Sequence, residues 1–233
     1  MNLNFSTKKV IRLLVVIVII LTLLSLIGQL YKYFLFEGND RYLVDLINVD
    51  KEKNFPTWFA SLNILFCSIL LFIISSVKRK TRDSFFYHWF TLSIIFLLMA
   101  TDEIMQLHEQ VITPIRGLLN TTGYLYITWV IPGILFGILF LVVYLKFLIH
   151  LPRQIKVLFI MSGLIYVSGA IGFEIIGSNH IYYYGQNNIS YALLTAGEEF
   201  LEMSGILLFT YTLLKYINIE FPQLGIYFRG NDS

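Results

Sequence analysis

Charged residues are scarce in this sequence. Its 233 residues are 57% hydrophobic and only 14% charged, whereas a typical soluble domain carries about 25% charged residues. Apolar stretches of about 20 residues, the length that an α-helix needs to cross a bilayer, recur along the whole chain. The shortage of charge therefore argues against a soluble domain and indicates a polytopic α-helical membrane protein whose partner is the lipid bilayer.

The sequence also lacks a cysteine pair, alternating apolar segments and a long polar region. The single cysteine, Cys67, lies in an apolar run, so it cannot form an intrachain disulfide. A membrane β-barrel would show short alternating segments instead of long apolar runs. The net charge of +2 gives no sign of nucleic-acid binding, and no nucleic-acid partner is expected. Since the longest polar stretch is residues 31–56, we expect one transmembrane domain over residues 1–233.

Six apolar segments predict six membrane-spanning helices, an all-α transmembrane bundle. The predicted spans cover about residues 10–30, 57–77, 84–107, 125–149, 154–177 and 191–217. Lysine and arginine gather beside alternate span ends, as in "VKRKTRD" at residues 77–83, and such residues concentrate on the cytoplasmic side of a membrane. With six spans, both termini are expected to be cytoplasmic. Pro132 and Gly133, inside the fourth span, predict a kink there.

Acidic residues interrupt three of these spans, all toward the predicted outer side. They are Asp102, Glu103 and Glu109 with His108 at the end of the third span, Glu174 in the fifth, and Glu198, Glu199 and Glu202 in the sixth. An acid inside a membrane is costly, and by default it marks a functional site. Protons or a cation must neutralise these groups, and Arg116 is the nearest candidate counter-charge in the sequence.

Helical spacing indicates which of these side chains share a face. Glu198 and Glu202 are four residues apart and therefore align on one helix. His108 is five residues from Glu103 and points elsewhere, unless the helix ends or turns between them. His180 lies in a polar loop, where a solvated role is more common than a ligand role.

The acids and His108 form a candidate site for a divalent metal ion. Carboxylates suit calcium or manganese, and an added imidazole suits iron or zinc. The proposed ligands are Asp102, Glu103, His108, Glu109, Glu174, Glu198, Glu199 and Glu202. The cluster contains neither the Glu-x-x-His pairs of di-iron bundles nor the His-Glu-x-x-His motif of zinc proteases.

Three short motifs resemble those of a group of uncharacterised bacterial multi-pass membrane proteins. The motifs are "NFPTWFASL" at 54–62, "DEIMQLHE" at 102–109 and "GEEFLEMSG" at 197–205, and the resemblance covers most of the chain. Thr101 departs from it, since the group has leucine before the Asp-Glu pair. The resemblance implies that these acids act together in a bacterial cytoplasmic (inner) membrane. It implies no reaction.

Three functions remain open from the sequence. The first is a metal-binding membrane protein, which could act as an enzyme on a lipid or amphiphilic substrate. The second is a proton or cation transporter or channel component that uses the same acids. The third is a structural or accessory subunit in which the acids only join helices by hydrogen bonds.

Overall fold

The computed structural model describes residues 7–34, 42–51 and 53–222. In these ranges the chain forms helices and contains no β-strand. Six helices are long and apolar enough to cross a membrane: α1 (Thr7–Phe34), α3 (Phe55–Lys80), α4 (Phe86–Met105), α7 (Val130–His150), a continuous helical segment over Arg153–Tyr184, and α10 (Ile189–Glu220). This is an integral membrane protein of the predicted all-α class, and each predicted span coincides with one of these helices apart from its ends.

The fifth long helix is not uniform. It consists of α8 (Arg153–Val167), a π-helical turn η2 (Ser168–Phe173) and α9 (Glu174–Tyr184). The remaining elements are α2 (Tyr42–Ile47), α5 (Leu107–Gln110), α6 (Ile112–Leu119) and the 3₁₀ turn η1 (Gly123–Leu125). A π-helical turn often lies at a functional site, and this one directly precedes the predicted site residue Glu174.

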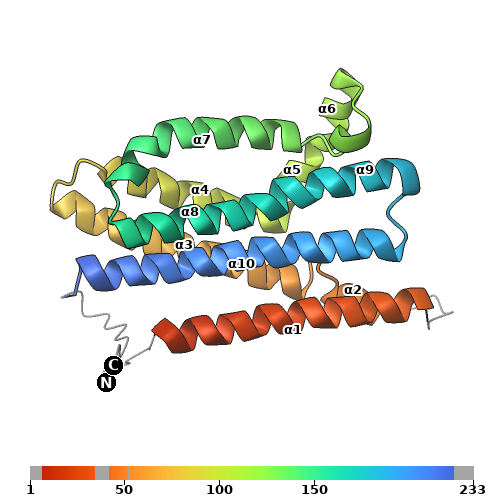
Figure 1. Ribbon diagram of the computed structural model, residues 1–233, viewed down its shortest axis with the longest axis horizontal. Coiled ribbons are helices and arrows are strands. Elements are labelled where there is room, and N and C mark those ends of the chain that lie inside the picture. Colours follow the sequence, from red (N-terminus) through yellow and green to blue (C-terminus); the bar gives the residue numbers. More distant parts are fainter. Residues whose placement is uncertain (1–6, 35–41, 52, 223–233) are drawn as a thin grey trace.

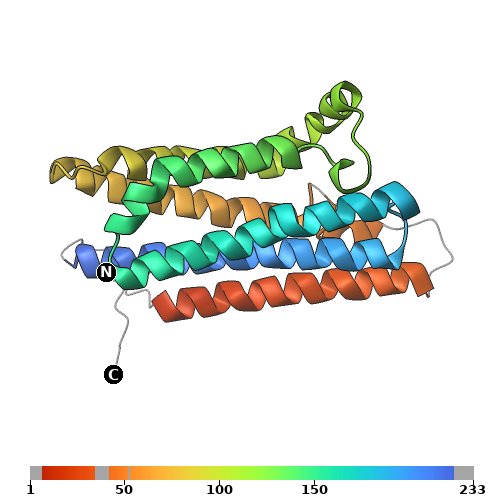
Figure 2. The same ribbon diagram turned by 45° about the horizontal axis from the view of Figure 1, so that its top comes forward.

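The six long helices alternate in direction and lie side by side (Figure 1). The start of α1 and the end of α10 lie at the same end of the bundle, which also carries Lys78–Arg82 and is here named the basic end. Helices α5 and α6 lie at the opposite end, here named the acidic end, as the view in Figure 2 also shows. The predicted alternation of the spans is therefore present.

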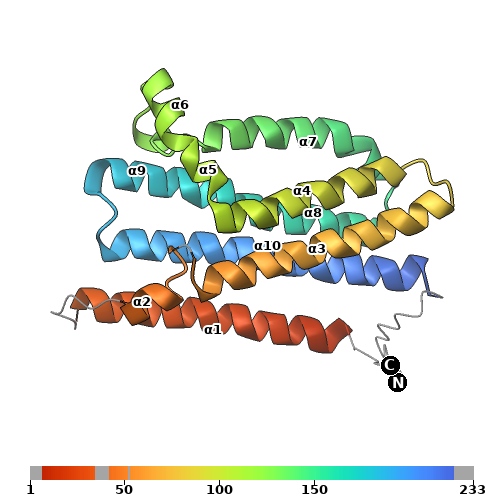
Figure 3. The ribbon, with the colours of Figure 1, turned by 180° about the vertical axis from the view of Figure 1, so that it is seen from behind.

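Helix α10 is the centre of the packing. It contacts α1, α3, α8, α9 and η2, while α3 lies along α4 (Figure 3). Side chains from α3, α4 and α10 form an apolar layer in the basic half of the bundle: Leu70, Leu71, Ile74, Leu92, Leu213 and Leu214, none more than 3% exposed. This layer separates the acidic residues from the basic end.

Polar side chains join α3 to α4 where the two helices pack. Ser61 Oγ donates a hydrogen bond of 2.7 Å to the carbonyl of Ala100, and Ser68 Oγ donates one of 2.7 Å to the carbonyl of Ser93. Hydrogen bonds and small residues hold helices together inside lipid, because burial of apolar surface gives little drive there. These two bonds fix α4 along α3 up to the turn before Asp102.

One prediction about the fourth span needs correction. The kink predicted at Pro132 is not needed, because α7 begins at Val130 and the proline lies in its first turn. A first-turn residue has no intrahelical acceptor for its N–H, so proline costs nothing there.

Candidate functional site

Helix α4 ends at Met105 because Gln106 adopts a left-handed conformation, with φ of 55°. The chain then turns back into α5. The N–H of His108 donates to Asp102 Oδ1 at 2.9 Å, and His108 Nδ1 lies 2.7 Å from Asp102 Oδ2. The helix therefore does end between Glu103 and His108. Asp102 holds His108 through both carboxylate oxygens, one on the backbone N–H and the other on the imidazole. We call this pair the Asp102–His108 clamp.

The clamp keeps His108 protonated. Burial alone would lower the pKa of His108, but the hydrogen bond and the charge of Asp102 raise it, with smaller contributions from Glu109 and Glu174, to about 9. The ring also lies edge-on to the indole of Trp129, with ring centroids 5.2 Å apart. At neutral pH the clamp is therefore an ion pair between the His108 cation and the Asp102 carboxylate, and the pair has no net charge.

A second pair of acids forms where the π-helical turn lies against α10. A Cβ atom on Gly169 would lie 2.7 Å from the carbonyl oxygen of Glu198, so only glycine permits this approach. Glu174, the first residue of α9, accepts a hydrogen bond of 2.9 Å from Trp129 Nε1. Glu174 and Glu198 also hydrogen-bond to each other. We call Glu174 and Glu198 the carboxyl pair.

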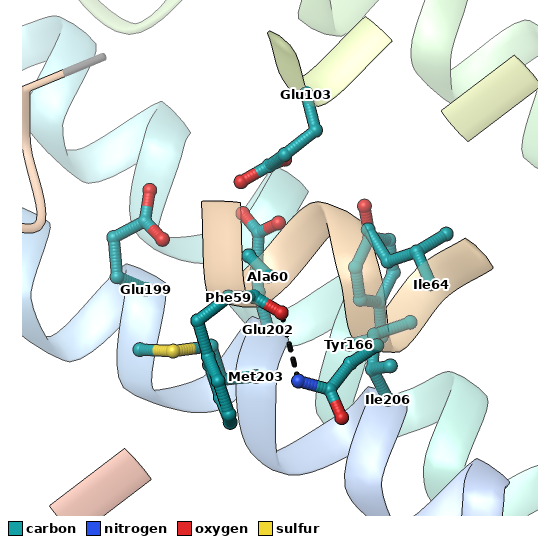
Figure 4. Close-up of a pocket in the computed structure, with 10 residues that line it drawn as sticks. Phe59, Ala60, Ile64, Glu103, Tyr166, Glu199, Glu202, Met203 and Ile206 are labelled. Atoms are coloured by element: carbon teal, nitrogen blue, oxygen red, sulfur yellow. Dashed lines mark hydrogen bonds between the residues drawn. The ribbon is translucent and has the colours of Figure 1, made fainter. Parts of the chain in front are cut away.

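A third group of acids faces a small cavity between α3, α4, α8 and α10 (Figure 4). Glu103 and Glu202 point toward one another, and Glu199 lies beside them. We call these three residues the cavity acids. The phenol of Tyr166 donates a hydrogen bond to Glu202. The space open to the centre of a water molecule is about 10 Å³, about enough for one water.

The carboxyl pair and the cavity acids are electrostatically connected through α10. Glu198 interacts with Glu199 and Glu202, and Glu202 interacts with Glu174 and with the His108 cation. A proton bound by one of these carboxyl groups therefore changes the affinity of the others for protons.

The structure brings most of the predicted site residues to this region but not all of them. Glu109 is exposed and receives only a long hydrogen bond of 3.4 Å from Gln106 Nε2. His180 was expected in a polar loop but lies in α9, and its Nε2 is 2.8 Å from Oδ1 of Asn188, the residue before α10. Neither side chain lines the cavity.

Arg116, the counter-charge expected from the sequence, contacts a loop residue instead of the acids. Arg116 Nε donates to the carbonyl of Tyr126 at 2.8 Å, and the guanidinium lies 3.7 Å from the centroid of that ring. Its charge is therefore used in ordering the loop before α7. The cation beside the acids is instead His108, and it pairs with one of them, Asp102.

The metal site predicted from the sequence finds no support in the arrangement of the side chains. In the part of the chain that the structure describes, no group of three or more His, Cys, Asp or Glu residues could hold a metal ion. Among the same residues, no lysine or arginine forms an ion pair with Glu174, Glu198 or Glu202. The ligand set proposed from the sequence thus remains a prediction.

Three residues of the site were not predicted as parts of it. Trp129 has the position of an interfacial aromatic residue, yet its indole holds Glu174. Tyr166 and Asn63 line the cavity, and Asn63 donates a hydrogen bond of 2.8 Å to the carbonyl of Phe59 (dashed line in Figure 4). A polar group inside a span was the available signal for Asn63, whereas tyrosine and tryptophan are common in spans without a site role.

Comparison with known proteins gives a family but no activity. No curated protein and no solved structure matches the chain. The family model described as Domain of unknown function (DUF8692) matches residues 10–216, a range that begins in α1, ends in α10 and includes every acid described above. The chain therefore belongs to the DUF8692 family.

Proposed function

We propose that this protein binds and releases protons at the carboxyl pair and the cavity acids, as a proton-coupled carrier in a membrane. The hydrogen bond between Glu174 and Glu198 carries this proposal. Two ionised carboxylates repel each other and offer no donor, so such a bond requires a proton on one of them. A proton shared between two half-buried acids is a site that can be loaded and emptied.

The shortage of positive charge near these acids supports protons as the species that they bind. The described part of the chain offers Glu174, Glu198 and Glu202 no lysine or arginine partner, and His108 is already paired with Asp102. An isolated ionised carboxylate in a low-dielectric interior is strongly unfavourable, and it takes up a proton instead. The cost of burial therefore favours protonation of this cluster when no other cation is bound.

The apolar layer favours a carrier over an open channel. Leu71, Leu213 and Leu214, each fully buried, lie between the cavity acids and the basic end. Protons would then reach the acids from the acidic end, and passage to the other side would need a rearrangement of the helices. A second solute whose movement is coupled to the proton fits this arrangement.

A divalent cation is the second candidate occupant, favoured by one observation. Glu103, Glu199 and Glu202 come from two helices and face one cavity (Figure 4). Closure of these carboxylates around calcium or manganese, or around iron or zinc with His108 added, would need the side chains to move. An enzyme acting on a lipid or amphiphile belongs to this second candidate.

The membrane and the orientation are part of the proposal. We place the protein in a bacterial cytoplasmic membrane, with both termini and the basic end in the cytoplasm. The lysine and arginine residues over Lys78–Arg82 support this orientation through the positive-inside tendency of membrane proteins. The acids would then open toward the outer side.

Infrared spectroscopy of the reconstituted protein tests the shared proton. The C=O stretching band of protonated carboxylic acids should be present at neutral pH and should weaken in Glu198→Gln and Glu174→Gln. Glu109→Gln is the matched control, because its carboxylate is exposed and outside the site. A wild-type spectrum without this band at neutral pH would contradict the proposal.

Transport and metal content are measured on the same preparations. Vesicles with a trapped pH-sensitive dye should report proton movement for the wild type and for Glu109→Gln, and none for Glu198→Gln. Elemental analysis decides between the occupants. A stoichiometric metal that is lost in Glu202→Gln would replace the proton proposal with the second candidate.

A further inference from the structure

A second cavity lies at the basic end, far from the acids described above. It lies where α3, α7 and α10 end and α4 and α8 begin. The space open to the centre of a water molecule is about 180 Å³, many times the volume needed for one water. Its lining includes Lys78, Asp83, Trp89, His150, Tyr216 and Glu220. This cavity can therefore hold a polar group larger than a water molecule.

Two carboxylates of the lining lie around the ammonium group of Lys78, which is itself a lining residue. Lys78 Nζ lies 3.0 Å from Asp83 Oδ2 and 3.6 Å from Glu220 Oε2, with side chains 13%, 20% and 32% exposed. The same ammonium lies 5.7 Å from the centroid of the Tyr216 ring, in the range of a cation–π contact. The cavity walls thus recognise an ammonium through both carboxylates and an aromatic face.

Lys78 does not satisfy both carboxylates. Besides His150, the lining carries two carboxylates and one lysine, which is a formal excess of one negative charge. Burial would raise the pKa of Asp83, but the N–H of Phe85 and the Lys78 ammonium lower it, so Asp83 is ionised at neutral pH. Glu220 is held only at 3.6 Å, which leaves it able to bind a second cation.

Aromatic rings form the rest of the wall. Trp89 lies against Tyr216 and Phe147, with ring centroids 4.8 Å and 4.9 Å apart. Arg79 and Arg153, both exposed, adjoin lining residues in sequence and add positive charge at this end of the bundle. An ammonium inside the cavity and a phosphate outside it, among the basic residues of this end, would match these two sets of charges.

We propose that this cavity binds a phosphoethanolamine group, with its ammonium between Glu220, Asp83 and the aromatic wall and its phosphate toward the arginines. The position at the helix ends corresponds to the headgroup level of a bilayer. The group could belong to phosphatidylethanolamine or to a free phosphoethanolamine molecule. This proposal is independent of the proton site at the acidic end.

Binding to the purified full-length protein in detergent tests the chemistry. Native mass spectrometry with short-chain phosphatidylethanolamine and phosphatidylglycerol should show at least about tenfold tighter binding of the ethanolamine lipid, because only it brings an ammonium to a charged acceptor. O-phosphoethanolamine is a separate arm. Competition by it at comparable concentration identifies the free molecule as a ligand, and lack of competition identifies the lipid headgroup.

Variants locate the site. Glu220→Gln should weaken ethanolamine-lipid binding by about tenfold, and Asp83→Asn should do the same if it folds. Glu220→Gln decides when Asp83→Asn does not fold, since Asp83 also accepts the N–H of Phe85. Glu109→Gln, an exposed acid at the other end, is the matched control. Equal binding of the two lipids, or unchanged binding in Glu220→Gln, would overturn the proposal.

Discussion

Removal of the Asp102 carboxylate should release the proton of His108. In Asp102→Asn the imidazole loses its charged acceptor at 2.7 Å and stays half-buried. Burial lowers the pKa of His108, and Asp102 is the main cause that raises it to about 9. We therefore expect the pKa of His108 in the variant to fall to 6.5 or below, so that the residue is mostly neutral at pH 8.

The contribution of the clamp to the stability of the protein follows from the raised pKa of His108. A rise from 6.5 to about 9 corresponds to about 3 kcal/mol between the charged and the neutral imidazole. The two side chains are 31% and 33% exposed, so solvent screening reduces this to about 1–2 kcal/mol of stability. Since the folded-state pKa is the raised one, this contribution is complete below pH 6.5 and is lost as the pH rises through about 9.

Carbon–proton correlation spectra of histidine-labelled protein measure this pKa directly. The His108 signal is assigned by its absence in His108→Gln. Glu109→Gln is the control, because Glu109 is a smaller cause of the raised pKa and should lower it much less. A His108 pKa near 6.5 in the wild type, or an unchanged value in Asp102→Asn, would refute the reasoning about the clamp.

Two further predictions concern helix packing. In Gly205→Ala the new Cβ would lie 2.7 Å from the backbone nitrogen of Tyr166. Thermal unfolding in detergent should therefore show a loss of stability of about 1–3 kcal/mol. Gly163→Ala is the control, because a Cβ there would have nothing within 4 Å, and it should lose no stability. In Ser61→Ala the 2.7 Å bond to Ala100 disappears, which should cost about 0.5–1.5 kcal/mol in the same assay. Ser76→Ala removes a bond of 2.8 Å within α3 alone, and an equal loss there would argue against the interhelical bond.

The six long helices were predictable because lipid imposes length and composition on each span. About 20 apolar residues are needed to cross a bilayer, and such a run can be read directly from the sequence. The direction of each helix followed from the count of spans. The common position of Glu103, Glu174 and Glu202 toward one end was predictable for the same reason, since alternation fixes which ends meet.

The contact between Asp102 and His108 was not predictable from helical spacing. It depends on the left-handed residue Gln106, which ends α4 and lets His108 reach Asp102. A helical periodicity assumes an unbroken helix, and glutamine is not a residue type that marks a left-handed turn. The π-helical turn before Glu174 has the same effect on α9, because it changes the face on which the next residues lie.

The apolar layer has an electrical consequence for a protein in an energised membrane. A stack of fully buried leucine and isoleucine side chains from α3 and α10 has a low dielectric constant, so most of the membrane potential should fall across it. A unit charge that crosses a potential of 100 mV changes its energy by about 2.3 kcal/mol. Protonation of Glu202 from the acidic end would sense little of this voltage, whereas any step that carries the proton past Leu213 toward Lys78 would sense nearly all of it.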